Sequence, residues 1–201
     1  SINVDYKHPD LISIPIGLSN DYSPKNIFKY DYKNLNIVEL ENKIDKLYAN
    51  FQKNTNFFYR SLLEKKLKKL NFITFDQPNL NSSEYLEKVA LHKYILCPKG
   101  NGLDTHRIWE SLYAGSIPVT EKLLTNEMCS DLPVLRIDNF KKINKSILNL
   151  NELKLEDKDF FNEKLRTSFW IKKMREAETE NNKDNSKKYL FTNSYNQIEK
   201  I

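Results

Sequence analysis

The sequence predicts an α/β fold in which a mainly parallel, Rossmann-like sheet is flanked by helices. Short apolar runs rich in β-branched and aromatic residues alternate with longer segments whose apolar residues recur at helical spacing. Residues 94–119 show this alternation most compactly, with an apolar run, a Gly-rich polar turn, an amphipathic helix pattern and a second apolar run. Alternation of this kind is typical of parallel sheets joined by crossover helices.

The elements follow from the pattern in chain order. The predicted strands span residues 12–16, 46–51, 71–75, 94–97, 117–119 and 133–137. The predicted helices span residues 55–70, 82–91, 105–114, a short segment near 121–129, and two segments near 140–150 and 156–174. A helical interpretation of 37–48 competes with the second strand. Pro15 favours an edge position or an irregular end for the first strand, and Gly115 is predicted to end the helix at 105–114.

The length of 201 residues predicts one Rossmann-like domain over residues 1–175. Residues 176–201 are rich in Glu, Asn, Lys and Ser, which predicts a charged helix extension or a tail. The chain begins with Ser1 rather than Met, so a removed N-terminal targeting segment or an upstream domain stays open. No apolar run is long enough to span a bilayer. We therefore expect a cytoplasmic protein and leave membrane association open.

The charge balance is mildly basic, with 32 basic and 27 acidic residues and a net charge of +5. The charges are interspersed, which favours a solvated surface, and no nucleic acid is expected as a partner. A weaker alternative is nucleic-acid binding through the Lys-rich helices at 61–70 and 141–150, which a steep salt dependence would support. Cys97, Cys129 and three scattered histidines give neither a disulfide framework nor a metal-ligand spacing.

The helix predicted at 105–114 has two unlike faces. Ile108 and Leu112 share an apolar face, and the opposite side is small apart from two charged residues; it comprises Arg107, Glu110, Ser111 and Ala114. A small face lets a ligand approach, with a guanidinium suited to phosphate and a carboxylate suited to a ribose diol. The alternative is a surface salt bridge worth a few tenths of a kcal/mol, and spacing alone favours that alternative.

The loop before this helix, residues 98–102, holds two of the four glycines of the chain. It is predicted to let backbone N–H groups meet a ligand, with an ordinary strand-to-helix turn as the alternative. Asp104 is predicted as the N-cap of the helix rather than as a catalytic acid. Lys99 and Arg60 are candidate phosphate cations, although each taken alone is more often a solvated charge. His106 is equally explained as a packed histidine or as a sugar contact.

Residues 100–119 read Gly-x-Gly-x-Asp-x-x-Arg-x-x-Glu-x-Leu-x-x-Gly-x-Ile-Pro-Val. This pattern resembles the nucleotide-sugar-binding motif of exostosin-like glycosyltransferases, which have the GT-B fold. Residues 94–98 and 131–134 also resemble that family, and the resemblance covers roughly residues 85–140. It implies that the chain corresponds to the donor-binding, C-terminal half of such an enzyme. The donor is expected to be a nucleotide diphosphate sugar, with UDP as the usual carrier.

The resemblance also implies roles for individual residues. Glu110 would bind the donor ribose, and Arg107 would bind the diphosphate or neutralise the leaving group. Arg107 and Asp104 are the expected catalytic residues. The residues expected to bind the nucleotide sugar are Lys99, Gly100, Asn101, Gly102, Thr105, His106, Arg107, Glu110 and Arg60. No metal and no cofactor are expected, because basic side chains and a helix dipole can stabilise a departing diphosphate.

One departure from the family concerns the missing half. A complete GT-B enzyme has two Rossmann-like domains, and the N-terminal one supplies the acceptor site and often the catalytic base. Asp21, Asp104 and His106 are conceivable bases, and none stands out. We therefore expect a glycan or glycoconjugate acceptor held by a missing N-terminal domain or a second subunit. The alternative function is a non-catalytic module that binds a nucleotide sugar or a partner protein.

Overall fold

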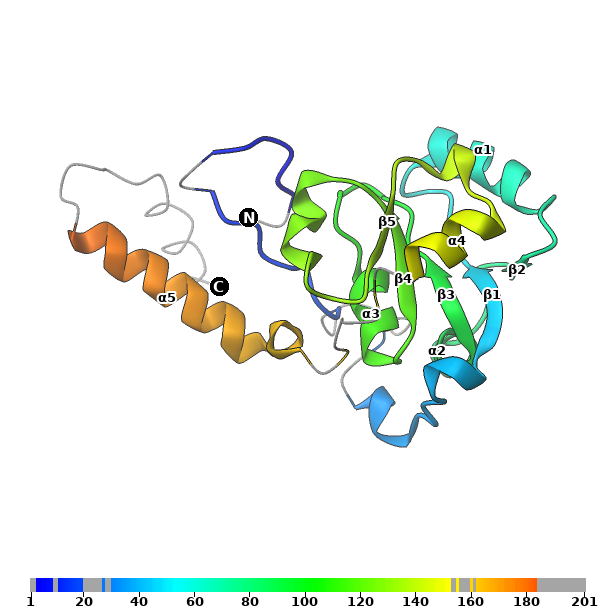
Figure 1. Ribbon diagram of the computed structural model, residues 1–201, viewed down its shortest axis with the longest axis horizontal. Helices are drawn as coiled ribbons and strands as arrows, with labels where there is room; N and C mark the ends of the chain where they lie inside the picture. Colours follow the sequence, from blue (N-terminus) through cyan, green and yellow to red (C-terminus); the bar gives the residue numbers. More distant parts are fainter. Residues whose placement is uncertain are drawn as a thin grey trace. The chain divides into compact units, whose positions relative to one another are not determined.

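The computed structural model describes residues 3–8, 11–19, 27, 30–152, 155, 160 and 162–183. The chain divides into two compact units, Ser1–Asn162 and Glu163–Ile201, and the sheet lies in the first unit (Figure 1). This division falls earlier than the domain end expected at residue 175. A helix, α5 (Thr167–Lys183), runs through that position without a break.

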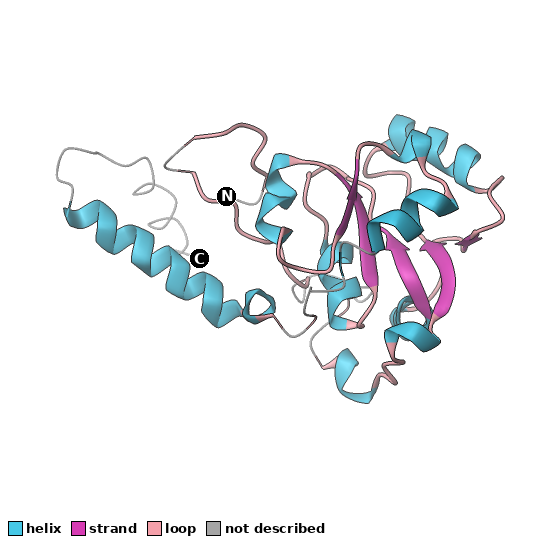
Figure 2. Ribbon diagram, viewed as in Figure 1, coloured by secondary structure: helices cyan, strands magenta, loops and turns pink. Residues whose placement is uncertain are grey.

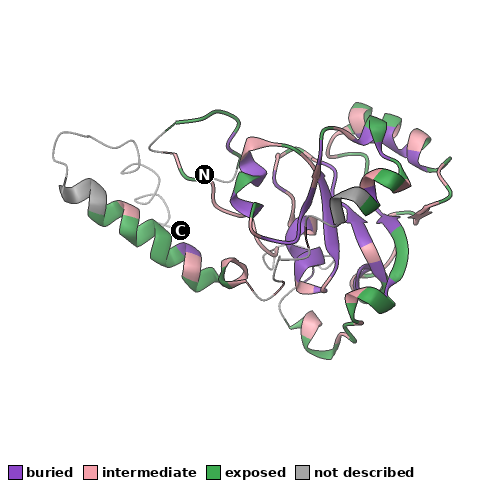
Figure 3. Cartoon of the chain, in the orientation of Figure 1, coloured by how far each residue is buried: buried purple, intermediate pink, exposed green. Residues whose placement is uncertain are grey.

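The sheet has five strands in the order β2-β1-β3-β4-β5, and every neighbouring pair is parallel (Figure 2). The strands span Ile44–Ala49 (β1), Ile73–Phe75 (β2), His92–Leu96 (β3), Ile117–Glu121 (β4) and Leu135–Ile137 (β5). This confirms the α/β fold and five of the six predicted strands. The central strands β3 and β4 are almost wholly buried (Figure 3), as expected where helices cover both faces of a parallel sheet.

The strand predicted at 12–16 is wrong, because residues 11–19 have no regular secondary structure. Pro15 lacks an N–H group, and the N–H of Ile16 donates to the carboxylate of Asp104 at 2.7 Å. The hydroxyl of Ser13 donates to the carbonyl of Thr125 at 3.1 Å. Single contacts therefore hold this apolar run against the loops that follow β3 and β4, at the carboxyl edge of the sheet.

Helices cover both faces of the sheet (Figure 1). Their bounds are Phe57–Leu67 (α1), Ser82–Leu91 (α2), His106–Tyr113 (α3) and Lys145–Glu152 (α4). Leu63 and Leu67 of α1 and Leu148 of α4 join one buried cluster with the side chains of one sheet face. On the other face, the ring of Tyr48 in β1 lies 6.4 Å from that of Tyr85 in α2, and α2 contacts α3.

The helix ends follow local sequence chemistry. Asn81, one residue before the predicted start, caps α2 reciprocally with Glu84: each side chain accepts a hydrogen bond from the backbone N–H of the other residue. Gly115 follows α3 with a φ of 65°, and its N–H donates to the carbonyl of Leu112 at 3.0 Å. The predicted stop at Gly115 is confirmed, because glycine adopts this left-handed conformation without strain.

The remaining helical predictions are met in part. The segment near 121–129 forms a 3₁₀ helix, Leu124–Cys129, and the competing helix at 37–48 is reduced to a 3₁₀ turn at Leu40–Asn42. The helix expected near 140–150 forms a 3₁₀ turn, Phe140–Lys142, followed by α4. Of the helix expected near 156–174, residues 156–159 and 161 lie outside the described residues. Glu163–Leu165 forms a 3₁₀ turn, and the α-helix begins only at Thr167. No helix in the described part of the chain is long and apolar enough to cross a membrane.

Lys43 is a buried cation, 5% exposed, immediately before β1. Its ammonium group donates to the carbonyl of Ala90 and, at 3.2 Å, to that of Ala114. These carbonyls lie at the ends of α2 and α3, where helix dipoles favour a positive charge. Burial lowers the pKa of Lys43 to about 8, and Glu39 acts in the opposite direction. One side chain thereby ties two helix ends together.

Candidate functional site

The loop between β3 and α3, residues 97–105, contains most of the predicted site residues. In a parallel sheet the carboxyl ends of all strands meet at one edge, so this loop lies beside the segments that follow β1 and β4. Its position is fixed by contacts with α1 and with the N-terminal segment. These contacts decide what each predicted residue can do.

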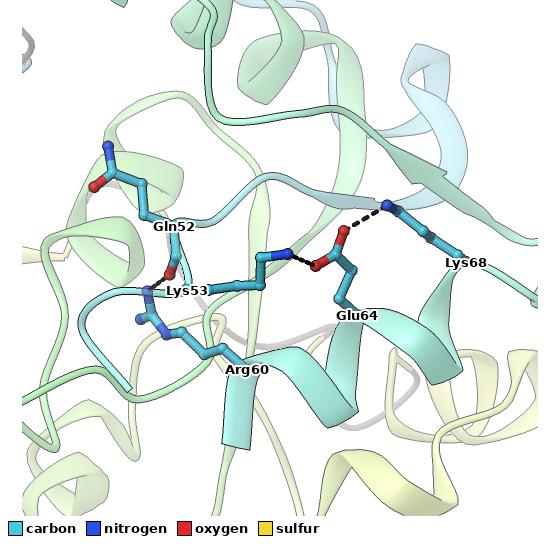
Figure 4. A network of polar contacts seen from close by, with 5 residues as sticks. All are labelled: Gln52, Lys53, Arg60, Glu64 and Lys68. Atoms are coloured by element: carbon cyan, nitrogen blue, oxygen red, sulfur yellow. Dashed lines mark hydrogen bonds and ion pairs between the residues drawn. The ribbon is translucent and has the colours of Figure 1, made fainter. Parts of the chain in front are cut away.

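Arg60 of α1 holds the beginning of this loop. Its Nε donates to the carbonyl of Lys99 at 3.0 Å, and its Nη2 donates to that of Pro98 at 2.8 Å. Its Nη1 donates to the carbonyl of Gln52, after β1, at 2.7 Å (Figure 4). Arg60 is 6% exposed, and its guanidinium lies 5.7 Å from the ring centre of Phe51. Each nitrogen of this candidate phosphate cation thus already binds a backbone carbonyl.

Both glycines of the loop lie where another side chain comes close. A Cβ on Gly100 would lie 3.1 Å from Nη2 of Arg60, and one on Gly102 would lie 2.9 Å from Oδ1 of Asn3. The same Asn3 oxygen accepts the N–H of Leu103 at 2.8 Å. The close approach that the sequence predicts for a ligand is, in this structure, made by side chains of the chain itself.

Lys99 and Asn101 border the loop. Asn101 is exposed, and the ammonium group of Lys99 lies 5.3 Å from the ring centre of Tyr59. The hydroxyl of Tyr59 donates to the carboxylate of Glu121 at 2.8 Å. Glu121 is the last residue of β4. The structure therefore places at this edge a carboxylate that the sequence analysis did not single out.

Asp104 joins α3 to the N-terminal segment. It is 4% exposed, and its carboxylate accepts the N–H groups of Ile16 at 2.7 Å and Thr105 at 2.8 Å. Both oxygens also lie 3.3 Å from the indole nitrogen of Trp109. Burial raises the pKa of Asp104, and these hydrogen bonds oppose the rise. The N-cap of α3 is Thr105, so the prediction that Asp104 caps the helix is wrong.

Thr105 and His106 lie at the same junction. Nδ1 of His106 is 2.8 Å from the carbonyl oxygen of Gly17, so that nitrogen carries the proton and donates it. Gly17 has a φ of 67°, in the left-handed region that favours glycine. The hydroxyl of Thr105 is buried and has no hydrogen-bond partner within the described ranges. His106 therefore supports the N-terminal segment, while Thr105 keeps a donor beside the first turn of α3.

Arg107 and Glu110 of α3 are joined through the hydroxyl of Tyr85 on α2. Nε of Arg107 donates to the Tyr85 oxygen at 2.9 Å, and the Tyr85 hydroxyl donates to Oε2 of Glu110 at 2.9 Å. The guanidinium also lies 5.6 Å from the ring centre of Tyr85. The salt bridge weighed as the alternative is thus replaced by a relay through a buried tyrosine.

The electrostatics of this relay keep Arg107 charged. Burial acts to lower the pKa of Arg107, but Tyr85 and Glu110 outweigh it and hold that pKa above its ordinary value. Burial raises the pKa of Tyr85 well above its ordinary value, so the hydroxyl keeps its proton. The two terminal nitrogens of Arg107 make no hydrogen bond to any described residue. They remain able to bind an anion.

The two arginines influence one another. Burial lowers the pKa of Arg60 to about 10, and the charge of Arg107 lowers it as well. Like charges in a poorly solvated place repel, and an anion bound close to both would relieve that repulsion. The positive end of the α3 dipole has the same preference. This edge of the sheet therefore favours a phosphate group.

The open, small face predicted for α3 is wrong. Ser111 and Ala114 are fully buried, and Glu110 is 9% exposed. The hydroxyl of Ser111 lies 4.0 Å from the sulfur of Cys97, and the hydroxyl of Tyr32 donates to the Glu110 carbonyl at 3.2 Å. The part of this face formed by Ser111 and Ala114 is therefore closed to a ligand, which can reach α3 only at its first turn and at the small exposed fraction of Glu110.

Tyr85 is the functional residue that sequence reasoning missed, because it lies on the apolar side of the helix predicted at 82–91. Its signal is a hydroxyl on a buried ring, which requires a polar partner. Asp21, one of the conceivable bases, lies outside the described residues. Within the described ranges, no group of three His, Cys, Asp or Glu side chains could hold a metal ion.

Residues 66–160 match the family model described as RXYLT1 C-terminal domain. For this segment, which contains Tyr85, Arg107 and Glu110, the match confirms the predicted resemblance to a glycosyltransferase domain. Among solved structures, the chain is similar to the crystal structure of α1,3-fucosyltransferase with GDP-fucose, with a TM-score of 0.42 and 19% identity. That similarity covers 64% of this chain and 41% of that chain, so this chain spans about two-fifths of the fucosyltransferase. No curated protein matches the chain.

Proposed function

We propose that this chain carries the donor-binding domain of a glycosyltransferase that transfers a sugar from a nucleotide diphosphate sugar to a glycan or glycoconjugate. The observation that carries the proposal is the charged group at the start of α3: Arg107, held through Tyr85, has two terminal nitrogens that bind no described residue, and its charge lowers the pKa of Arg60. The glycosyltransferase match covers Arg107 but begins after Arg60.

In the proposed complex, the diphosphate lies against the first turn of α3. The terminal nitrogens of Arg107 donate to its oxygens as a planar fork, and the hydroxyl of Thr105 adds a donor. Loop backbone at Gly100 and Gly102 lies beside the diphosphate, and Oε1 of Glu110 accepts a ribose hydroxyl. The remaining expected contacts are Lys99, Asn101 and His106, with Arg60 acting mainly by holding the loop.

The proposed reaction breaks the bond between the sugar C1 and the diphosphate oxygen and forms a bond from C1 to an acceptor oxygen. Negative charge collects on the departing diphosphate, where Arg107 and the α3 dipole stabilise it without a metal ion. The acceptor hydroxyl loses its proton to a base supplied by a further domain or subunit. Asp104 contributes by fixing the entry to α3, since its carboxylate already accepts hydrogen bonds from Ile16 and Thr105.

Calorimetry with UDP, GDP, CMP and inorganic pyrophosphate tests the binding. We expect a nucleoside diphosphate, UDP by resemblance, to bind in the presence of a chelator. Arg107→Gln should weaken nucleotide binding roughly 10- to 100-fold. The control is Arg136→Gln, which replaces a half-buried arginine of β5 and should leave the affinity unchanged. Unchanged affinity in Arg107→Gln contradicts the proposal.

Glu110→Gln tests the ribose contact. It should weaken nucleotide binding and leave pyrophosphate binding nearly unchanged, because only the nucleotide has a diol.

The second candidate is a binding module without turnover, which is favoured because two of the conceivable bases, Asp104 and His106, are already engaged in hydrogen bonds with the backbone. Product release from a radiolabelled nucleotide sugar separates the two. Hydrolysis or transfer by the chain alone supports the transferase. Binding alone, with turnover only after a partner domain is added, supports the module.

A further inference from the structure

We propose that the outer face of α1 binds an anionic membrane surface. This face comprises Phe57, Phe58, Leu62, Lys65 and Lys69, the last lying just beyond the helix. The inference goes beyond sugar transfer and does not depend on it. It rests on which side chains α1 exposes, on the charges beside them and on where the one acidic residue of α1 points.

The apolar part of this face is highly exposed. Phe57 is 61% exposed, Phe58 83% and Leu62 65%, and the two phenylalanine rings touch edge to face at 5.8 Å. Single exposed apolar residues are common, but three large ones at one end of a short helix form a patch. The opposite side of α1 already buries Leu63 and Leu67 against the sheet (Figure 3). The patch is therefore not needed for the fold.

The charge beside the patch is only positive. Lys65 and Lys69 are exposed and form no ion pair with the residues that the structure describes. Glu64 is the only acidic residue of α1, is 8% exposed, and points away to pair with Lys53 at 2.9 Å and with Lys68 (Figure 4). Those two lysines lower the pKa of Glu64, so the carboxylate stays charged and engaged.

An anionic bilayer fits this combination better than other partners. Aromatic and leucine side chains insert at the headgroup boundary, while lysines extend their stems along the apolar layer and hold their charges at the phosphates. A nucleic acid would engage the lysines and leave Leu62 without a partner. The proposed face belongs to one helix, and a protein segment is usually held in a groove between two elements, whereas a bilayer needs only the exposed face itself.

The proposed surface lies next to the candidate site. Asn56, just before α1, donates through its side-chain amide to the carbonyl of Gly100 at 3.3 Å. Arg60, one turn into the helix, holds Pro98 and Lys99. A bilayer seated on Phe57 and Phe58 would therefore lie beside the 97–105 loop.

Flotation of the full chain with vesicles tests the proposal. We expect binding to phosphatidylcholine vesicles that contain roughly one phosphatidylserine in four lipids, and little binding to phosphatidylcholine alone. Phe58→Ser/Leu62→Ser should reduce binding at least about tenfold. Lys65→Gln/Lys69→Gln should reduce it roughly 25-fold, at about fivefold for each lysine. All four side chains are exposed, so thermal melts should match the unaltered chain.

Matched variants elsewhere on the first unit provide the controls. Tyr6→Ser removes another large exposed side chain, and Lys33→Gln/Lys88→Gln removes two exposed lysines. Both should bind vesicles normally, and all variants should keep the nucleotide affinity of the unaltered chain. Three results overturn the proposal: no binding of the unaltered chain to anionic vesicles, equal losses in control and α1 variants, or α1 lysines that affect only oligonucleotide binding.

Discussion

The Tyr85 hydroxyl accepts a hydrogen bond from Nε of Arg107 at 2.9 Å. The two residues lie on different helices, 22 positions apart in the chain. The contact fixes the guanidinium, and its terminal nitrogens have no hydrogen-bond partner in the part of the chain that the structure describes. The same hydroxyl donates to Glu110. One neutral group therefore aligns a cation and an anion, and the donor site proposed above depends on this alignment.

Replacing Tyr85 with Phe should weaken nucleotide binding although Tyr85 itself touches no nucleotide in the proposed complex. The change leaves Nε of Arg107 and Oε2 of Glu110 without their partner, which should lower the free energy of unfolding by about 1–3 kcal/mol. Urea unfolding and calorimetry measure the two effects. Tyr48→Phe, which removes a hydroxyl bonded to Asp76 at 3.2 Å, is the control and should spare nucleotide affinity. A destabilised Tyr85→Phe protein with full affinity would show that the relay is only structural.

Arg60→Lys should destabilise the loop at 97–105 although it keeps the positive charge. Lysine cannot reproduce the fork that serves the carbonyls of Gln52, Pro98 and Lys99. Losing two of these bonds should cost about 2–3 kcal/mol and speed amide exchange in the loop. Arg136→Lys, which alters a longer contact of 3.5 Å between Nη1 and the carbonyl of Asn126, should cost far less. Equal losses in the two variants would refute a special role for Arg60.

His92 should make the protein sensitive to mild acid. It is 3% exposed, stacks on Tyr48 at 4.9 Å, and its Nδ1 lies 2.7 Å from the carbonyl of Lys88. Burial lowers the pKa of His92, so the unfolded chain takes up a proton near pH 6.5 before the folded chain does. Stability is therefore complete above about pH 6.5 and falls below it by up to about 1.4 kcal/mol per pH unit.

Unfolding midpoints between about pH 7 and pH 5 measure this slope. His92→Asn places an amide nitrogen where Nδ1 lies, can still donate to Lys88 and should flatten the slope, whereas His8→Asn at an exposed position should not. A slope that is the same in all three proteins would assign the acid sensitivity to other groups.

Lys43 should change the stability of the protein in mildly alkaline solution. Burial lowers its pKa to about 8, so above that pH the folded chain has released a proton that the unfolded chain keeps until about pH 10.4. Stability should rise with pH across this window by up to about 1.4 kcal/mol per unit. The Lys43→Met variant should lack the rise. If both proteins gain stability equally between about pH 8 and pH 10, other groups are responsible.

The sequence by itself determined the five sheet strands and the helices α1 to α3. Each has a local cause: β-branched and aromatic runs for strands, apolar residues at helical spacing for helices, and Gly115 for the stop after α3. The motif at 100–119 also identified the loop and helix that the glycosyltransferase match covers. These properties depend on residues that lie a few positions apart in the chain, so they can be predicted from the sequence.

Only the tertiary structure decided the partners of the charged residues. Arg60 binds carbonyls 38 and 39 positions away, and Asp104 binds the N–H of Ile16 88 positions away. Helical spacing described the flank of Glu110 as open because it cannot include α2 and Tyr32, which cover that flank. The apolar run at 12–16 likewise formed no strand. The backbone N–H of Ile16 donates to the carboxylate of Asp104 instead of to a neighbouring strand. Long-range hydrogen bonds form where the chain topology brings a donor and an acceptor together. The spacing of residues within one helix or strand does not show which distant groups will meet.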